Sequence, residues 1–336
     1  MKKLTIMLTV ILTVVAFSGC DWFKPPYTPP TGADANVAVY VLNSAGSISV
    51  IDLEEDSVYN DVATVGTWPN QLVYRDGKLY CVNSGSNNIT IYDVSTWEDE
   101  TPIALGAGNN PMKMVFYDDN TAYVSCSVSN KVLKLNMATK TVARELNAGV
   151  GCTGIAIAND KVYASNTGYV YGSPYLQGTV SVFDAASGDS VTTIDVGTNP
   201  QDIALAGDGK LHVVATGDWW SIFGTVSVID PETDAVTATY PIGGTPGSIA
   251  IDEANGVGYC GSWGTGAIAY DTDDGTVITS TFAGHGGSGI MFFDAVWLSD
   301  WDADMVFKYS TEGTAIDSFL VGDSPSALAF RNDPQD

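Results

Sequence analysis

The sequence is built from a repeated unit, seen most completely at residues 161–206. The segment holds runs of about four to seven residues, rich in Val and Ile and separated by Gly, Asn, Asp, Ser or Pro. Such runs favour short β-strands joined by tight turns. We interpret the unit as one four-stranded antiparallel sheet followed by the first strand of the next.

Three markers of this unit recur along the chain at steps of 38 to 49 residues. A strand that ends in a polar residue recurs at Asp52, Asp93, Asn136, Asp184, Asp230, Asp271 and Ser310. A turn before a short apolar strand recurs at Pro69, Pro111, Cys152, Pro200, Pro246, Gly287 and Pro325. An aromatic strand position recurs at Tyr40, Tyr80, Tyr123, Tyr163, His212, Tyr259 and Trp297. The markers predict seven units.

A repeat of this length with four strands per unit predicts an all-β, seven-bladed β-propeller with four-stranded antiparallel blades. A solenoid is the alternative array, but it needs caps and has no reason to close. The first unit lacks the apolar strand that follows the turn elsewhere, and the chain ends with that piece at residues 325–330. We therefore predict that the C-terminal strand completes the first blade and closes the ring.

Residues 37–330 resemble the YVTN family of propeller repeats, through units such as KVYASN, GTVSVFD, GTVSVID and VGTNPQDIA. The resemblance implies the propeller fold. It leaves the function open, because such propellers include scaffolds, surface proteins, nucleic-acid binders and some enzymes.

The N-terminal residues 1–20 have the form of a secretory signal, with Lys2 and Lys3 before an apolar run and Ser-Gly-Cys at the end. This ending resembles a bacterial lipobox, so Cys20 is the expected site of lipidation and the lipid the expected contact with a membrane. An ordinary cleaved signal with a chance Cys is the alternative. Residues 21–36 form a Pro-rich linker and residues 331–336 a C-terminal tail. The expected location is a bacterial cell envelope, lipid-anchored and either periplasmic or surface-exposed.

The chain is strongly acidic, with 39 Asp and Glu against 14 Lys and Arg and a formal net charge of −25. Such a surface repels nucleic acid and anionic lipid headgroups, and attracts cations and basic partners. We therefore expect no nucleic-acid partner. Solubility in a saline habitat would also explain the charge.

Departures from the repeat concentrate at one end of the channel, the top, where the turn before each inner strand meets the loop after the second strand. The fourth unit has a long loop at residues 167–178, and the fifth has one at 217–224. The aromatic residues predicted to form this rim are Tyr169, Tyr171, Tyr175, Trp219, Trp220, Phe223, Trp263 and Trp301. They suggest a stacking surface for a glycan, a peptide or a protein. Alternatively, the loops pack on each other as a lid.

The residues just after each turn are predicted to line the channel mouth: Asn70, Gln71, Met112, Lys113, Thr153, Gln201, Asp202 and Ser248. The set is mixed and uncharged overall. Propeller lactonases hold a central divalent ion with several carboxylate and Asn oxygens, whereas only Asp202 and Asn70 would fit that role here.

Histidine is scarce, which restricts acid–base chemistry. His212 takes the aromatic strand position and is predicted to pack, whereas His285 is predicted at the top, as a rim residue and the one candidate for proton transfer or metal ligation. Asp300, Asp302 and Asp304 have the D-x-D-x-D spacing of calcium ligands but lack the Gly and distal Glu of a calcium loop. Calcium is therefore a weak candidate cofactor, and a solvated turn is the alternative.

Four cysteines remain besides Cys20. Cys81 and Cys260 occupy the same strand position in the second and sixth units, so they cannot meet and are predicted to be buried thiols. Cys126 and Cys152 lie at the same end of neighbouring units and are predicted to form a disulfide in an oxidising compartment.

Three function hypotheses follow from these residues. The first is an envelope lipoprotein that binds a ligand or protein at its top without catalysis. The second is a metal-assisted envelope hydrolase or lyase at the channel mouth, and the third is a purely structural surface protein. The fold serves all three, so residues at the site must decide.

Overall fold

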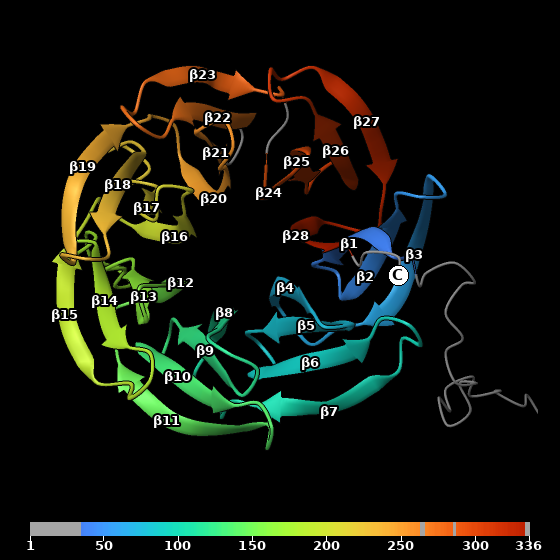
Figure 1. The fold of residues 1–336 in the computed structure, drawn as a ribbon, viewed down its shortest axis with the longest axis horizontal. Coiled ribbons are helices and arrows are strands. Elements are labelled where there is room, and N and C mark those ends of the chain that lie inside the picture. Colours follow the sequence, from blue (N-terminus) through green and yellow to red (C-terminus); the bar gives the residue numbers. More distant parts are fainter. Residues whose placement is uncertain (1–34, 263–265, 285–286, 333–336) are drawn as a thin grey trace, which may run out of the picture.

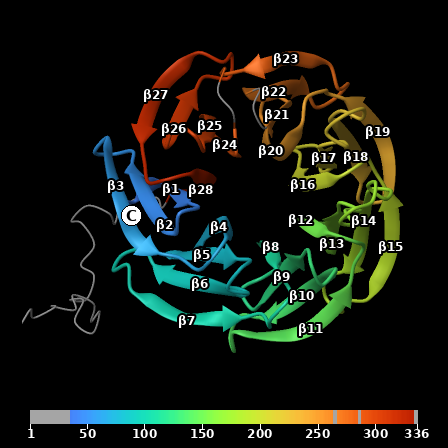
Figure 2. The ribbon, with the colours of Figure 1, turned by 180° about the vertical axis from the view of Figure 1, so that it is seen from behind.

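The computed structural model describes residues 35–262, 266–284 and 287–332, and these form a ring of seven four-stranded antiparallel sheets (Figure 1). The predicted all-β, seven-bladed propeller is confirmed. Figure 2 shows the ring from behind, with one strand of each blade facing the centre and one at the periphery. The described ranges contain no helix and so no helical segment that could cross a membrane.

The strands are given from the innermost to the outermost of each blade. Blade 1 consists of β28 (Pro325–Asn332), β1 (Val37–Asn43), β2 (Ser47–Asp52) and β3 (Ser57–Thr64). Blade 2 consists of β4 (Pro69–Arg75), β5 (Lys78–Asn83), β6 (Asn88–Asp93) and β7 (Asp99–Ala104). Blade 3 consists of β8 (Pro111–Phe116), β9 (Thr121–Cys126), β10 (Lys131–Asn136) and β11 (Thr141–Asn147). Blades 4 and 5 are β12 (Cys152–Ala158), β13 (Lys161–Asn166), β14 (Thr179–Asp184) and β15 (Ser190–Asp195); and β16 (Pro200–Leu205), β17 (Leu211–Ala215), β18 (Thr225–Asp230) and β19 (Ala235–Pro241). Blades 6 and 7 are β20 (Pro246–Asp252), β21 (Val257–Ser262), β22 (Gly266–Asp271) and β23 (Val277–Phe282); and β24 (Gly289–Phe293), β25 (Ala295–Asp300), β26 (Met305–Tyr309) and β27 (Ala315–Leu320).

The C-terminal strand closes the ring, as predicted. β28 pairs antiparallel with β1, with Leu328 opposite Val41 and Phe330 opposite Val39 (Figure 1). Phe330 also stacks on Phe293 of blade 7, with ring centroids 3.5 Å apart. The last strand thus completes blade 1 and also contacts blade 7. It continues to Asn332, two residues past the predicted end.

The core lies between the blades, because each sheet packs both faces against its neighbours. The second strands are buried almost throughout, as in β13, whereas the outer strand β19 alternates between half-buried and exposed residues. This explains the sequence pattern: strands buried on both faces need near-continuous apolar residues, and peripheral strands need them only at alternate positions.

The recurring aromatic position fills the wedge between blades. The Tyr163 ring is fully buried, and its hydroxyl donates to Asp234 Oδ1 of the next blade at 2.5 Å. The Tyr123 hydroxyl likewise donates to the Ala185 carbonyl at 2.6 Å. A Tyr therefore supplies apolar area inside and a satisfied hydroxyl at the edge of the core, which explains why the repeat keeps it.

Candidate functional site

A cavity of about 870 Å³ occupies the centre of the ring, lined by the innermost strands of all seven blades. Its lining includes the turn residues Trp68 and Ser324, which precede inner strands, and the loop residues Ser44 and Trp301, which follow second strands. These two kinds of loop lie at the same end of antiparallel blades, so the cavity opens at the top. All the residues predicted for the channel mouth line it: Asn70, Gln71, Met112, Lys113, Thr153, Gln201, Asp202 and Ser248.

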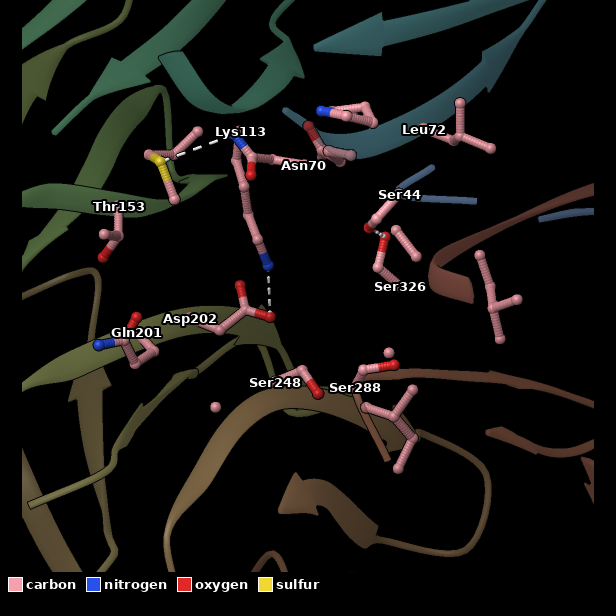
Figure 3. Close-up of a pocket in the computed structure, with 18 of the residues that line it drawn as sticks. Ser44, Asn70, Leu72, Lys113, Thr153, Gln201, Asp202, Ser248, Ser288 and Ser326 are labelled. Carbon is pink, nitrogen blue, oxygen red and sulfur yellow. Dashed lines mark hydrogen bonds and ion pairs between the residues drawn. The ribbon is translucent and has the colours of Figure 1, made fainter. Parts of the chain in front are cut away.

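An ion pair crosses the cavity wall. Lys113 Nζ on β8 lies 2.6 Å from Asp202 Oδ2 on β16, and the pair spans the face of the intervening blade 4 (Figure 3). Asp202 also accepts hydrogen bonds from the backbone N–H groups of Ile203 and Ile249, which fix its carboxylate. Among the described lining residues these two side chains are the only charged ones, so the cavity wall carries no net charge.

Several mouth side chains brace one blade against the next. Asn70 donates to the Pro111 carbonyl at 3.0 Å and Thr153 to the Pro200 carbonyl at 3.2 Å. Gln71 makes two hydrogen bonds to the backbone of Met114, accepting from its N–H and donating to its carbonyl. These residues therefore stabilise the ring as well as lining the cavity.

Trp68 is a residue that the sequence analysis missed. It directly precedes Pro69, where blades 3 and 5 have Asn110 and Asn199, and it shares their positive φ, here 50°. Asn tolerates this conformation, whereas a bulky aromatic residue adopts it with strain of about 1–3 kcal/mol. The side chain is 70% exposed at the cavity mouth, so burial does not explain its presence. The signal was a Trp at a repeat position that holds Asn, Gly, Thr or Ser in the other units.

The aromatic loops stand apart from the cavity, on the top of the neighbouring blades 4 and 5. Tyr171 and Trp220 are 91% and 87% exposed, and Tyr175 is half-buried against Tyr169 with ring centroids 5.5 Å apart. The further exposed aromatic residues here are Tyr169, Trp219 and Phe223. We call the set Tyr169, Tyr171, Tyr175, Trp219, Trp220 and Phe223 the aromatic rim. Tyr171 and Trp220 are the most exposed of these rings, so the set presents aromatic surface to solvent.

The backbone of the blade 5 loop is fixed by one carboxylate. Asp218 Oδ1 accepts hydrogen bonds from the N–H groups of Trp220, Ser221 and Ile222 at 2.7 to 2.9 Å, and these bonds hold the pKa of Asp218 well below its usual range. Trp219 has a φ of 72°, and a Cβ on Gly217 would lie 1.9 Å from the Ile222 carbonyl oxygen. The loop thus presents its Trp pair in one defined conformation.

Three further residues were predicted for the rim, Trp263, Trp301 and His285, and the structure describes only Trp301. Trp301 follows β25 and is 40% exposed where it lines the cavity, so it belongs to the mouth rather than to the aromatic rim. Trp263 and His285 lie outside the described residues, as does Cys20.

The acidic run beside Trp301 forms a hydrogen-bonded turn. Asp300 Oδ1 accepts from the N–H groups of Asp302 and Ala303, and Asp304 Oδ1 accepts from the Ser324 N–H at 2.8 Å. Within the described ranges no three His, Cys, Asp or Glu residues converge on a point that could hold a metal ion. Calcium at Asp300, Asp302 and Asp304 stays a prediction.

All four cysteines of the propeller are buried free thiols, which differs from the expected disulfide between Cys126 and Cys152. Burial raises the pKa of Cys152 to about 12, and Cys152 is close enough that its charge would further raise the pKa of Cys126. The pairing in protein from an oxidising compartment stays a prediction for mass spectrometry without reduction. Cys81 and Cys260 are likewise buried thiols.

His212 packs in the wall of the ring, as its strand position indicated. It is buried, its Nδ1 lies 2.9 Å from the Tyr270 hydroxyl of the next blade, and burial lowers its pKa to about 4. It is therefore neutral at pH 7, and it does not line the cavity.

No family model and no curated protein sequence matches the chain. Among solved structures it is similar to a quinoprotein alcohol dehydrogenase-like protein from Bacteroides thetaiotaomicron, at 16% identity and a TM-score of 0.66, covering 89% of this chain and 79% of that one. It is also similar to streptogramin B lyase, at 15% identity and a TM-score of 0.62, covering 78% of this chain and 90% of that one. At these identities the likeness shows the propeller fold alone.

Proposed function

We propose that this chain is a bacterial envelope lipoprotein, anchored through Cys20, whose YVTN-like propeller binds a protein partner through the aromatic rim without catalysing a reaction. The observation that carries the proposal is the exposure of Tyr171 and Trp220 on loops of neighbouring blades. Exposed aromatic rings add little to folding stability, and Trp and Tyr dominate the energetics of protein interfaces.

The fixed loop backbone supports the same function. Asp218 orders the Trp219–Trp220 segment before any partner arrives, so little conformational entropy remains to be lost on binding. The acidic surface favours a partner with basic charge and speeds its association at low salt. The two similar solved structures are named for different activities, a dehydrogenase-like protein and a lyase, so the fold does not choose among functions.

The rim is tested by site-specific photo-crosslinking in the cell of origin. A photoreactive residue at Tyr171 is expected to give a discrete crosslinked product, and the Trp219→Ala, Trp220→Ala double variant should abolish it. The same residue at Ile316, exposed on the outer strand of blade 7, is the matched control. The same products from both positions, or none from Tyr171, would contradict the proposal.

The anchor is tested separately. Replacing Cys20 with Ala should stop incorporation of a radiolabelled fatty acid and release the protein from the membrane fraction, while leaving the crosslink at Tyr171 intact in reconstituted mixtures. Unchanged membrane association of the unlipidated variant would refute the lipid anchor.

A further inference from the structure

The central cavity has the size and lining of a small-molecule site. Its volume of about 870 Å³ lies within the range typical of ligand pockets, about 300 to 1,000 Å³. Hydroxyl groups from several blades surround it, including Ser44, Thr153, Ser248, Ser288 and Ser326, alongside Ile and Leu side chains (Figure 3). The lining therefore combines polar and apolar groups.

The ion pair restricts the charge of a ligand. The Lys113 ammonium group, 2.6 Å away, already balances the charge of the Asp202 carboxylate. A charged ligand would therefore have to break that ion pair or leave its own charge uncompensated in the cavity. A neutral hydroxyl group, by contrast, can donate to the carboxylate and accept from the ammonium group, with both hydrogen bonds strengthened by the charge. The wall therefore favours a ligand that is uncharged and rich in hydroxyl groups.

Two Trp side chains flank the mouth from different blades, Trp68 before β4 and Trp301 after β25. The Trp68 backbone carbonyl accepts from both the N–H and the hydroxyl of Ser84, which fixes the strained turn. A Cβ on Gly85 would lie 3.0 Å from the indole, so the glycine leaves room for it. A flat apolar face held at a polar cavity suits ligands with both C–H and O–H surfaces.

One hydroxyl of the wall is unused. Ser248 lines the cavity, and its Oγ atom is buried and has no hydrogen-bond partner among the described residues. Buried polar groups without a partner are uncommon, because each forfeits the hydrogen bonds that it made in water. Rotation of the Ser248 side chain toward the cavity would let a ligand hydroxyl supply the missing partner.

From these observations we infer a second binding site, separate from the aromatic rim: the central cavity binds a neutral carbohydrate. The Lys113–Asp202 pair and the Ser248 hydroxyl hydrogen-bond its hydroxyl groups, and Trp68 and Trp301 stack on its C–H faces. The inference goes beyond the proposed protein-binding function and uses none of the residues of the aromatic rim.

The experiment measures binding of four sugars by saturation-transfer NMR and calorimetry. The probes are the neutral maltose, cellobiose and N,N′-diacetylchitobiose, with glucuronic acid as the charged control. At least one neutral disaccharide is expected to bind and glucuronic acid is not. No binding by any neutral probe up to about 10 mM, or equal binding of glucuronic acid, overturns the inference.

Variants assign the binding to the cavity. Trp68→Asn, which introduces the residue found at this position in other blades, should weaken binding about 30-fold, as removal of an aromatic anchor does elsewhere. The charge-neutral double variant Lys113→Met, Asp202→Asn should also weaken it. Unchanged affinity in both folded variants overturns the inference.

The aromatic rim supplies the matched control. The Trp219→Ala, Trp220→Ala variant should bind the sugar as the wild type does while losing its crosslinked partner. Trp68→Asn should lose sugar binding and keep the crosslinked partner. The two variants therefore test the two site assignments separately. Loss of sugar binding in the rim variant would place the sugar on the rim and contradict the cavity site.

Discussion

Tyr163 in the wall of the ring and Trp220 on its top are both large aromatic side chains, yet they lie in opposite environments. Tyr163 is fully buried between blades and its hydroxyl is bonded to Asp234, whereas Trp220 is mostly exposed on a loop whose backbone Asp218 holds in place. The first placement gains stability from burial, and the second gains almost none. The comparison separates residues that build the propeller from residues that we propose bind a partner.

Of the changes to the wall of the ring, meaning the packed sheets and the buried residues between them, removal of the closing strand should lower stability most. Deleting residues 325–336 removes β28, leaves β1 with an open edge and strips Phe293 of its stacking partner. We expect loss of most of the free energy of unfolding, which for domains is about 5–15 kcal/mol, and so no cooperative transition near the wild-type temperature. A synthetic peptide of residues 325–332 should restore part of the transition. An unchanged melting temperature after truncation would show that closure adds nothing to stability.

The wall should also respond to pH through His212. Its folded pKa of about 4 lies below the unfolded value of about 6.5, so between these values the unfolded chain binds a proton that the folded chain does not. The stabilising contribution is therefore complete above about pH 6.5 and falls by roughly 3 kcal/mol as the pH drops to about 4.

The measurement is denaturant unfolding of the wild type and of His212→Phe across this pH window. The variant should lack this part of the pH dependence, because Phe does not titrate, while keeping the part due to carboxylates. Identical pH profiles for the two proteins would show that His212 is not buried in its neutral form.

Trp68 is exposed like Trp220, but its backbone conformation is strained. Its replacement should raise the free energy of unfolding slightly, whereas the preceding changes lower it. Trp68→Asn relieves the strain of a bulky residue at positive φ while removing little buried area, so we expect stabilisation of about 1 kcal/mol by denaturant unfolding. The control is Trp301→Ala, which has no such strain to relieve and removes a side chain that is only 40% exposed, so it should destabilise by about 1 kcal/mol or more. Destabilisation by Trp68→Asn would mean that the indole packs against the protein and belongs to the wall.

The repeat markers predicted the wall well for a physical reason. A blade buried on both faces needs the same residue types at the same positions, so the turn at Pro69 or Pro200 and the final Asp of β2 or β18 recur where the strands begin and end. Blade 7 departs slightly, since β24 begins at Gly289, two residues after the expected turn position at Gly287. The closing strand followed from the same repetition.

The site was less predictable, because it depends on side-chain reach and local backbone rather than on repetition. The mouth residues were placed by register, but the Lys113–Asp202 pair spans a whole blade and has no spacing signature. The backbone hydrogen bonds to Asp218 and the positive φ of Trp68 are local backbone features that composition does not reveal. The free state of Cys126 and Cys152 likewise depends on geometry between two blades.

The most direct test of the separation between wall and rim is thermal unfolding of two variants side by side. Tyr163→Ala empties a buried wedge and should destabilise by about 3–5 kcal/mol, lowering the melting temperature by roughly 5–10 °C. The Trp219→Ala, Trp220→Ala double variant should lower the melting temperature by only about 3 °C, because Trp220 is 87% exposed and Trp219 is 44% exposed. A fall in the double variant as large as that of Tyr163→Ala would show that the rim is core, and would contradict its assignment as a recognition surface.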